Sequence, residues 1–393
     1  MTHAATIAPV ALTEAELRAG GGRKWAVPDD VLPAWLADMD LAVAPPVAAA
    51  VRRLAERADF GYALRDGARP AAALADAFAG WMRRRHGWDA DPAGVLPVAD
   101  LVQALFGVVV ALTDPGEEVI VQLPRYAPIA EAVNATGRTL APNPLRRDET
   151  GRWRLDLDRL DALASSPRAR LLILCNPHNP TGRVFARAEL EAVAAIAAEH
   201  GLVVASDEIH ADLVFDGAAH VPFATLAGAA ERTVTLTSAT KAFNLAGLRC
   251  AVAHFGSQEL RERYHRRLPE RMHGAPNVAG ADATIAAWRH GDAWLDATLA
   301  LLAGNRDRVG RALDGLPRLR WTRPEGTYLG WLDCGGLPRG GQTAGRFLLE
   351  RARVRLSDGI EFGAGCDDWA RLNFATSPAL LERIVERIAA AAG

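Results

Sequence analysis

The sequence predicts an α/β protein with a mostly parallel sheet covered by helices and a smaller α+β domain at the C-terminal end. Short apolar runs alternate with amphipathic stretches, which is the order of a parallel sheet with helices on both faces. Beyond Pro276, longer helical stretches separate shorter strands. A length of 393 residues also exceeds the size at which one core usually stops growing. We expect an N-terminal arm and small-domain segment (1–55), a large domain (56–285) and a small C-terminal domain (286–393).

The composition is that of a globular protein whose ligand is a small molecule. Hydrophobic residues make up 50% and charged residues 23%, the formal net charge is -2, and no dense block of Lys and Arg occurs. This balance argues against nucleic acid and an anionic membrane as partners. The N-terminus lacks a signal-peptide pattern and no run of about 18 apolar residues occurs, so we expect a cytoplasmic protein.

The four cysteines provide no metal or disulfide pattern. Cys175, Cys250, Cys334 and Cys366 are far apart and form neither a CxxC pair nor a Cys/His ligand spacing. We therefore expect reduced, mostly buried thiols and no metal site.

The N-terminal part begins with an arm and leads into a helix. Residues 1–34 show little periodicity, whereas 45–54 have the Pro-Pro start and apolar spacing of a helix. Between them, Asp38 and Asp40 lie in the stretch Trp35-Leu-Ala-Asp-Met-Asp-Leu. The two carboxylates are either a general acid–base couple or, as is more common, a pair that caps and turns the chain.

Two helices are expected in the next part of the chain. Phe60-Gly-Tyr62 precedes a helix over 71–86, and a second helix begins near Ala99 and Asp100 and ends at residue 112. The start of the second helix exposes backbone N–H groups and the positive end of the helix dipole, which form a natural anion site. Asp100 either caps this helix or points inward, where its carboxylate would compete with a bound phosphate for the same donors.

Four informative polar groups follow the predicted strands of the large domain. We expect strands at 119–121, 171–174, 202–205 and 234–237, with helices at 130–136 and 187–200. Tyr126, Asn179, Asp207 and Lys241 come shortly after the ends of these strands. Ligands of open α/β sheets bind at the carboxyl ends of the strands, so we expect the four side chains to share one site.

The C-terminal part alternates helices with a few strands. We expect helices over 279–290, 294–313, 343–351 and 378–392, and strands over 326–333 and 370–374. Arg371, in the second of these strands, is either a clamp for a substrate carboxylate or a partner in a surface ion pair.

Lys241 lies among small and hydroxyl residues, in a chain with very few lysines, and we expect it to share with Ser238 a tight turn that enters a helix. This setting favours covalently held pyridoxal 5'-phosphate, a cofactor that needs an acidic partner, a phosphate site and a flat group against its ring. The candidates are Asp207 for the ring nitrogen, Asn179 and His210 for the phenolic oxygen, Ser238 and Arg249 for the phosphate, and Tyr126 for the ring. Taken singly, they are also explained as a solvated lysine, a capping aspartate, a turn asparagine and a core aromatic residue.

Several separated motifs together resemble a known family. Ser238-Ala-Thr-Lys241 with Arg249, Asn176-Pro-His-Asn-Pro-Thr-Gly182 and Ser206-Asp-Glu-Ile-His210 are similar to motifs of the fold type I pyridoxal-phosphate enzymes in the class I/II aminotransferase superfamily. Trp35-Leu-Ala-Asp-Met-Asp40, Phe60-Gly-Tyr62 and Glu325-Gly-Thr-Tyr-Leu-Gly-Trp-Leu-Asp333 resemble the cystathionine β-lyase, or cysteine-S-conjugate C–S lyase, branch. The resemblance runs from about Trp35 to the C-terminus and implies the aminotransferase-like fold type I.

The resemblance implies a role for each candidate residue. Lys241 would form the Schiff base with pyridoxal 5'-phosphate and move the substrate proton, with Asp207 and Tyr126 as catalytic partners. Arg371 would bind the substrate α-carboxylate, and Asp38 and Tyr62 would also face the substrate. The remaining implied contacts are Asn179 and His210 at the phenolic oxygen, and Ser238, Arg249, the backbone of Ala99 and Asp100, and Tyr62 from the second subunit of a homodimer at the phosphate.

One stretch departs from the pattern of the lyase branch. Val98-Ala-Asp-Leu101 stands where these lyases usually carry Gly or Ser followed by small apolar residues. The phosphate loop is therefore altered, and Arg249 is a candidate to compensate.

The resemblance implies a C–S β-lyase that cleaves an L-cysteine thioether to a thiol, pyruvate and ammonia after removal of the Cα proton. An aminotransferase uses the same residues up to the carbanion, so transamination stays open, as does decarboxylation or oxidative deamination of a sulfur-linked amino acid. A regulatory protein with this fold is the non-enzymatic alternative. Against it, the arm of about 34 residues has no basic face and is too short for a DNA-binding helix-turn-helix.

Overall fold

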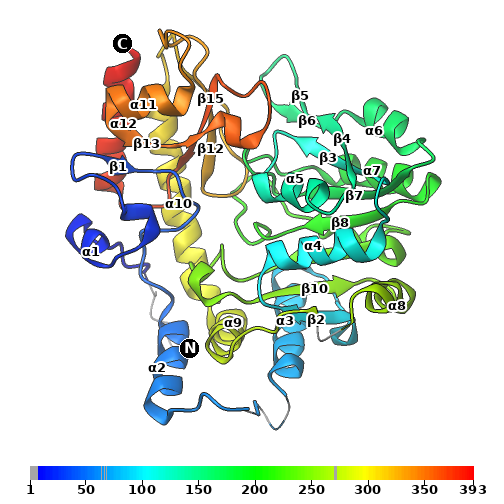
Figure 1. Ribbon diagram of the computed structural model, residues 1–393. Coiled ribbons are helices and arrows are strands. Elements are labelled where there is room, and N and C mark those ends of the chain that lie inside the picture. Colours follow the sequence, from blue (N-terminus) through cyan, green and yellow to red (C-terminus); the bar gives the residue numbers. More distant parts are fainter. Residues whose placement is uncertain (1–7, 63, 66, 68, 270–271) are drawn as a thin grey trace.

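A computed structural model describes residues 8–62, 64–65, 67, 69–269 and 272–393 (Figure 1). The start of the N-terminal arm, residues 1–7, lies outside this range. The described part of the arm contains helix α1 (Glu14–Ala19) and strand β1 (Leu32–Pro33), and it is followed by helix α2 (Pro45–Arg57).

A seven-stranded sheet lies at the centre of the fold. Its order is β2-β10-β9-β8-β7-β3-β4, and all neighbours are parallel except that β10 is antiparallel to both β2 and β9. The mostly parallel sheet expected from the sequence is thereby confirmed. Its strands are β2 (Val95–Val98), β3 (Glu118–Leu123), β4 (Thr139–Pro144), β7 (Ala169–Cys175), β8 (Val203–Asp207), β9 (Thr233–Thr237) and β10 (Ala251–Phe255).

Helices cover both faces of this sheet because successive residues of a strand point to opposite sides. In β7, Leu171 and Ile173 belong to one core with α4, α5 and α8, whereas Leu172 and Leu174 belong to another with α6 and α7. Each such buried leucine contributes about 2 kcal/mol to the free energy of unfolding. The helices are α4 (Leu101–Leu112), α5 (Ala127–Asn134), α6 (Leu157–Ala164), α7 (Arg187–Glu199) and α8 (Gln258–Arg267).

A four-stranded antiparallel sheet carries the C-terminal part of the chain. Its order is β11-β12-β15-β14, formed by β11 (Arg320–Trp321), β12 (Leu329–Asp333), β15 (Trp369–Asn373) and β14 (Ser357–Asp358). The helices α10 (Asp292–Leu313), α11 (Ala344–Ala352) and α12 (Pro378–Ala392) share a core with it. Strand β1 pairs in parallel with β13 (Val354–Arg355), so the N-terminal segment lies beside the C-terminal part (Figure 1).

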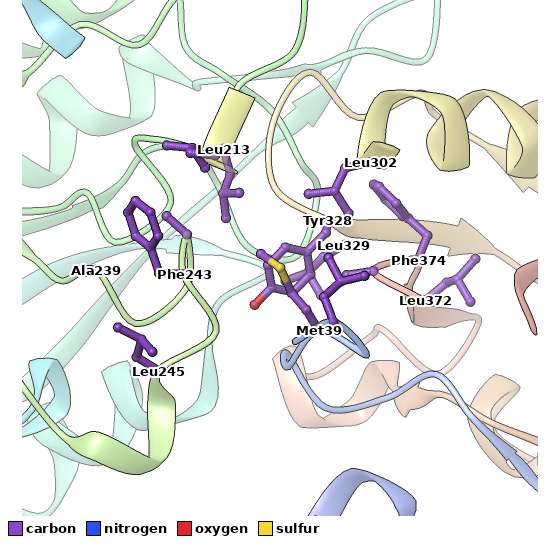
Figure 2. Close-up of a cluster of buried hydrophobic side chains, with 14 of the residues drawn as sticks. Met39, Leu213, Ala239, Phe243, Leu245, Leu302, Tyr328, Leu329, Leu372 and Phe374 are labelled. Carbon is purple, nitrogen blue, oxygen red and sulfur yellow. The ribbon is translucent and has the colours of Figure 1, made fainter. Parts of the chain in front are cut away.

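One hydrophobic core joins the N-terminal segment, α3 (Pro70–His86), α9 (Val278–His290) and the small sheet. Figure 2 shows its part around Tyr328, where side chains from distant segments gather: Met39, Leu213, Ala239, Phe243, Leu245, Leu302, Leu329, Leu372 and Phe374. Ala239, Phe243 and Leu245 flank Lys241 in the sequence. The core therefore fixes the backbone on both sides of Lys241.

The segment after β9 differs from the expectation. The sequence predicts that the turn at Lys241 enters a helix, but residues 239–244 form successive turns that lead to a short 3-10 helix, η5 (Ala246–Leu248). Asn244 and Arg249 have φ values of 59° and 47°. These left-handed conformations are incompatible with a continuous α-helix.

The remaining elements are short. They are β5 (Arg146–Arg147), β6 (Trp153–Arg154) and the 3-10 helices η1 (Arg23–Trp25), η2 (Pro92–Gly94), η3 (Phe223–Thr225), η4 (Ala230–Arg232) and η7 (Gly359–Phe362). All four cysteines are free, and three of them are buried, as expected from the sequence. None of the helices in the described part of the chain has both the length and the apolar character needed to cross a membrane.

Candidate active site

A cavity of about 470 Å³ lies at the carboxyl ends of β3, β7, β8 and β9. Asp100 reaches it from the start of α4, and Arg371 reaches it from β15 of the small sheet. The predicted site residues that line it are Asp100, Tyr126, Asn179, Asp207, His210, Ser238, Lys241, Arg249 and Arg371. Ala99, Asp38 and Tyr62 are not among its lining residues.

Lys241 has its amine close to a backbone carbonyl inside the cavity. Its Nζ donates a hydrogen bond to the Ala37 carbonyl oxygen at 2.9 Å. Burial lowers the pKa of Lys241, against the opposing effect of the nearby carboxylates of Asp38 and Asp207. An amine with a lowered pKa is more often unprotonated, and hence more nucleophilic, than a solvated lysine.

Asp207 ends β8 with its carboxylate buried beside the cavity. Its Oδ1 accepts a hydrogen bond from the Ile209 N–H at 3.2 Å. Burial raises the pKa of Asp207 to about 7, and the charge of neighbouring Glu208 adds to the increase. A cation next to Asp207 would stabilise its ionised form, so the position suits a protonated ring nitrogen.

Glu208 does not line the cavity, but its contacts stabilise the segment next to Asp207. No motif in the sequence predicts this role. Its carboxylate accepts hydrogen bonds from Ser206 Oγ at 2.8 Å and from the Phe223 N–H at 2.9 Å, and it lies 2.9 Å from Nε2 of His220. These contacts tie together distant parts of the segment between β8 and β9. Because His210 belongs to this segment, the contacts also restrain its position.

Arg371 and Asn179, which both line the cavity, are joined by a hydrogen bond. Arg371 donates to Asn179 Oδ1 and to the Trp35 carbonyl oxygen, both at 2.9 Å, and to Ser357 Oγ at 3.0 Å. Burial lowers the pKa of Arg371 to about 10. Arg371 is 5% exposed, so the alternative of a surface ion pair does not describe its environment.

His210 lines the cavity and carries an unsatisfied polar atom. It is buried, and its Nδ1 has no hydrogen-bond partner among the described residues. Burial lowers the pKa of His210 to about 3, so the ring is neutral at pH 7. Buried polar atoms are nearly always hydrogen-bonded in folded proteins, and a ligand in the cavity would satisfy this one.

Tyr328, within the motif that runs from Glu325 to Asp333, contributes to the site although the sequence predicts no role for it. Its hydroxyl donates to the Ala37 carbonyl oxygen at 2.9 Å, the same oxygen that Lys241 contacts. The amide of Asn244 binds the Met39 and Leu41 carbonyl oxygens, and that of Asn373 binds those of Leu36 and Asp38. These side chains together fix the backbone of residues 36–41 over the cavity.

Asp38 and Asp40 do not form a couple. Asp40 is buried and accepts hydrogen bonds from Lys24 Nζ at 2.8 Å and Trp25 Nε1 at 2.7 Å, which makes it a structural anchor of the arm. Asp38 is half-buried, and its charge opposes the lowering of the pKa of Lys241. Asp38 therefore acts on the site through its charge, and a contact with substrate stays a prediction.

Gly182 explains why the Asn-Pro-Thr-Gly turn supports the site. Its φ is 69°, and a Cβ there would lie 2.3 Å from Pro324 Cβ. The Gly182 carbonyl oxygen accepts hydrogen bonds from the N–H groups of Glu325 at 2.8 Å and Gly326 at 2.9 Å. The turn thus holds the loop that leads to Tyr328, and only glycine combines this φ with such a close approach.

The residues predicted to bind the phosphate include one charged pair, Asp100 and Arg249. Asp100 caps α4, accepting from the Gln103 N–H at 2.8 Å, and forms an ion pair with Arg249. Ser238 Oγ donates to the Cys250 carbonyl oxygen at 2.6 Å. The Ala99 N–H donates to the Gly274 carbonyl oxygen at 2.9 Å, so its backbone donor is already engaged.

Three further residues take different positions. Tyr126 follows β3, lines the cavity and is 39% exposed, and burial of its hydroxyl raises its pKa. Tyr62 lies outside the cavity and is fully exposed. His178 is buried, its Nδ1 is 2.8 Å from Thr181 Oγ1, and burial lowers its pKa to about 3, so it stabilises the turn before Gly182.

Comparisons with known proteins identify a family. The model of the family "aminotransferase class I and II" matches residues 38–388. Cystathionine β-lyase PatB of Bacillus subtilis (strain 168) is 34% identical over 364 residues, which are 92% of each chain. Cystathionine β-lyase of Corynebacterium glutamicum is 34% identical over 367 residues, which are 93% of this chain and 95% of that protein.

A solved structure supports the same relationship. The crystal structure of a C–S lyase from Staphylococcus hominis, bound to pyridoxal 5'-phosphate, matches with a TM-score of 0.88 and 26% sequence identity. The match covers 95% of this chain and 96% of that chain. The aminotransferase-like fold expected from the sequence is thereby confirmed.

Proposed function

The chain belongs to the aminotransferase class I and II family, and we propose that it is a pyridoxal-5'-phosphate-dependent carbon–sulfur β-lyase that cleaves L-cysteine thioethers. The observation that carries the proposal is the placement of Lys241, Asp207 and Arg371 in one cavity, although they come from three separate elements. The choice of β-elimination is supported by the activities for which PatB, the Corynebacterium glutamicum lyase and the Staphylococcus hominis lyase are named.

The residues of the cavity fit the cofactor. The unsatisfied Nδ1 of His210 provides a polar contact, the raised pKa of Asp207 suits a cationic ring nitrogen, and the Lys241 amine suits an aldehyde. Asn179 would join His210 at the phenolic oxygen, and Tyr126 would pack on the ring. The first turn of α4, Ser238 and Arg249 would hold the phosphate.

The proposed reaction divides its work among residues of this chain. When bound, the cofactor supplies an electron sink for the electron pair left on the substrate Cα. Arg371 binds the α-carboxylate with its planar guanidinium, which orients the Cα–H bond toward Lys241. The free amine of Lys241 accepts the Cα proton, because burial keeps its pKa low.

The overall balance consumes one water. The bond from Cβ to sulfur breaks, the sulfur keeps the electron pair and takes up a proton, and the thiol leaves. The remaining three-carbon fragment hydrolyses to pyruvate and ammonia. Asp207 stays ionised throughout if a cationic nitrogen lies beside it, which is the condition for the electron sink.

A homodimer with a shared active site is part of the proposal. Phe60, Tyr62 and Leu64 are exposed to 67%, 112% and 65%, respectively, on one connection between α2 and α3. An apolar segment of this kind favours contact with a second copy, and Tyr62 of the partner subunit would then complete the phosphate end. The cytoplasmic location and the domain division at 55/56 and 285/286 stay predictions.

Product analysis tests the reaction. The purified protein, incubated with cystathionine or an S-alkyl-L-cysteine, is expected to release thiol and pyruvate in equal amounts without an added amino acceptor. Lys241→Ala should lose at least roughly 100-fold in rate, because the proton-transfer group is absent. Circular dichroism would show whether that variant is folded.

A different product pattern would contradict the proposal. Formation of a keto acid that depends on an added amino acceptor, without thiol release, would identify an aminotransferase. Release of carbon dioxide or consumption of oxygen would identify the decarboxylating or oxidative alternative. A wild-type protein without visible cofactor absorption would exclude all of these enzymes.

A further inference from the structure

The side chain of Asp100 binds two groups at the phosphate end of the cavity. Its Oδ1 accepts a hydrogen bond from the Gln103 N–H, in the first turn of α4, at 2.8 Å. Its Oδ2 forms an ion pair with the Arg249 guanidinium. Asp100, Gln103 and Arg249 all line the cavity that contains Lys241. The carboxylate is therefore an anion that the chain itself supplies to this end of the site.

Both partners of Asp100 are of a kind that commonly binds phosphate in proteins. Backbone N–H groups at a helix start and a guanidinium both favour a phosphate oxygen. Two of the neighbouring donors are already engaged within the chain. The Ala99 N–H is engaged by the Gly274 carbonyl oxygen at 2.9 Å, and the Ser238 hydroxyl donates to the Cys250 carbonyl oxygen at 2.6 Å.

A phosphate at this end meets the Asp100 carboxylate in one of two ways. If it takes Arg249 and the Gln103 N–H, the carboxylate loses both partners. If the carboxylate keeps them, two negative groups share one end of the cavity, and their repulsion weakens binding. Both arrangements oppose the phosphate. We propose that Asp100 competes with the cofactor's phosphate for Arg249 and the start of α4, and thereby weakens the hold of the protein on pyridoxal 5'-phosphate.

This inference rests on the proposed function, because it assumes that pyridoxal 5'-phosphate is the ligand. Its consequence is specific to the phosphate group. Pyridoxal, which has the same ring and aldehyde but no phosphate, does not compete with Asp100. Comparing the binding of pyridoxal 5'-phosphate with that of pyridoxal therefore distinguishes competition at the phosphate from a general change of the cavity.

A second aspartate in the chain provides a matched control. Asp156 caps α6, accepts a hydrogen bond from the Arg159 N–H at 3.1 Å, and forms an ion pair with Arg146 at 2.5 Å. It thus combines a helix cap with an arginine partner, as Asp100 does. Asp156 is not among the residues that line the cavity.

The test measures ligand binding in a Lys241→Ala background, where no covalent bond to the lysine contributes. Equilibrium dialysis gives the Kd of pyridoxal 5'-phosphate and of pyridoxal for this protein, alone and combined with Asp100→Asn or Asp156→Asn. Asparagine can still cap a helix, so Asp100→Asn removes the charge and keeps the cap. We expect Asp100→Asn to lower the Kd of pyridoxal 5'-phosphate roughly fivefold or more, the size of the repulsion between unit charges about 4 Å apart in water. The Kd of pyridoxal should not change, and Asp156→Asn should change neither.

The other outcomes overturn the inference. A higher or unchanged Kd of pyridoxal 5'-phosphate in Asp100→Asn would mean that Asp100 positions Arg249 for the phosphate or is irrelevant to it. An equal decrease for both ligands, or the same decrease in Asp156→Asn, would mean a change unrelated to phosphate. If the wild-type protein shows no visible cofactor absorption and binds neither ligand, the proposed function fails as well, and that result is distinct from the others. Retention of the holoenzyme's visible absorption during dialysis gives a second readout: Asp100→Asn with Lys241 intact should lose it more slowly than the wild type.

Discussion

The deep wall and the outer edge of the cavity hold their charged groups in different ways. The deep wall consists of Asn179, Asp207, His210 and Arg371, which are all at most 7% exposed. The outer edge consists of Asp100 and Arg249, whose side chains are 28% and 64% exposed. In the wall, the charged groups of Asp207 and Arg371 bind neutral groups, whereas at the edge Asp100 and Arg249 form an ion pair with each other.

The difference shows which part of the site controls which property. Burial shifts the pKa of Asp207, His210 and Arg371. The nearby charges of Lys241 and Glu361 offset the shifts of Asp207 and Arg371 only in part, and a ligand that supplies a close partner gains from it. The exposed pair at the edge is screened by water and salt. We therefore expect the wall to determine the chemistry and the edge to adjust the affinity.

Asp207→Asn should have the largest effect, with opposite signs for activity and stability. If Asp207 keeps the ring nitrogen cationic, its loss should lower the rate of thiol release roughly 100- to 1,000-fold, the size of the effect when one preorganised electrostatic group is removed. The cofactor-free variant should nevertheless be more stable than the cofactor-free wild type above pH 7, because asparagine carries no buried charge. Steady-state kinetics and urea unfolding at several pH values measure the two effects.

The pH dependence follows from the direction of the shift. Burial raises the pKa of Asp207 from 3.8 to about 7, so ionisation destabilises the cofactor-free wild type progressively as the pH rises from about 4 to 7. The stability difference between the proteins should be absent near pH 4 and reach at most about 4 kcal/mol above pH 7. His178 and His210 stay neutral in both proteins over this range, and their contribution cancels. Equal stability of both proteins at pH 8 would mean that Asp207 is not desolvated in the wall.

The deep wall could be predicted from the sequence better than its supports. Tyr126, Asn179, Asp207 and Lys241 follow apolar strands, and the parallel arrangement of β3, β7, β8 and β9 places their ends along one edge of the sheet. Sequence order alone is enough for such a prediction. The periodicity of 378–392 likewise gave the bounds of α12.

The residues that support the wall, such as Glu208 and Tyr328, act through contacts that no local sequence pattern predicts. Glu208 has its partners at positions 206, 220 and 223, and Tyr328 shares the Ala37 carbonyl oxygen with Lys241 across 291 positions of the chain. The pairing of β1 with β13 joins opposite ends of the sequence. The prediction of a helix directly after Lys241 was wrong, because Asn244 and Arg249 are left-handed. Asparagine adopts this conformation more readily than most residues, whereas for Arg249 no local propensity predicts it.

Arg371→Lys should have the second-largest effect. It tests whether substrate binding depends on the hydrogen-bond geometry of the guanidinium or on its charge alone. Lysine keeps the charge but cannot reproduce three hydrogen bonds made by one planar group. We expect the KM for an S-alkyl-L-cysteine to rise roughly 10- to 100-fold, with a smaller change in kcat. Arg306→Lys, at another buried arginine, is the control for general loss of packing. A decrease in kcat alone would assign Arg371 to a different role.

Arg249→Gln should have the smallest effect, and its dependence on salt distinguishes the edge from the wall. The Arg249 guanidinium is largely exposed, so its attraction for a phosphate is screened over a Debye length of about 10 Å at 0.1 M salt. Its removal also frees the Asp100 carboxylate, which then adds its repulsion. We expect the Kd of pyridoxal 5'-phosphate to rise roughly two- to tenfold at 0.05 M NaCl and to differ less from that of the wild type at 0.5 M NaCl. Asp207→Asn should show no comparable change in its defect with salt, because its surroundings exclude water. If the Arg249→Gln defect persisted at high salt, the edge would be as desolvated as the wall, and the contrast between the two regions would be lost.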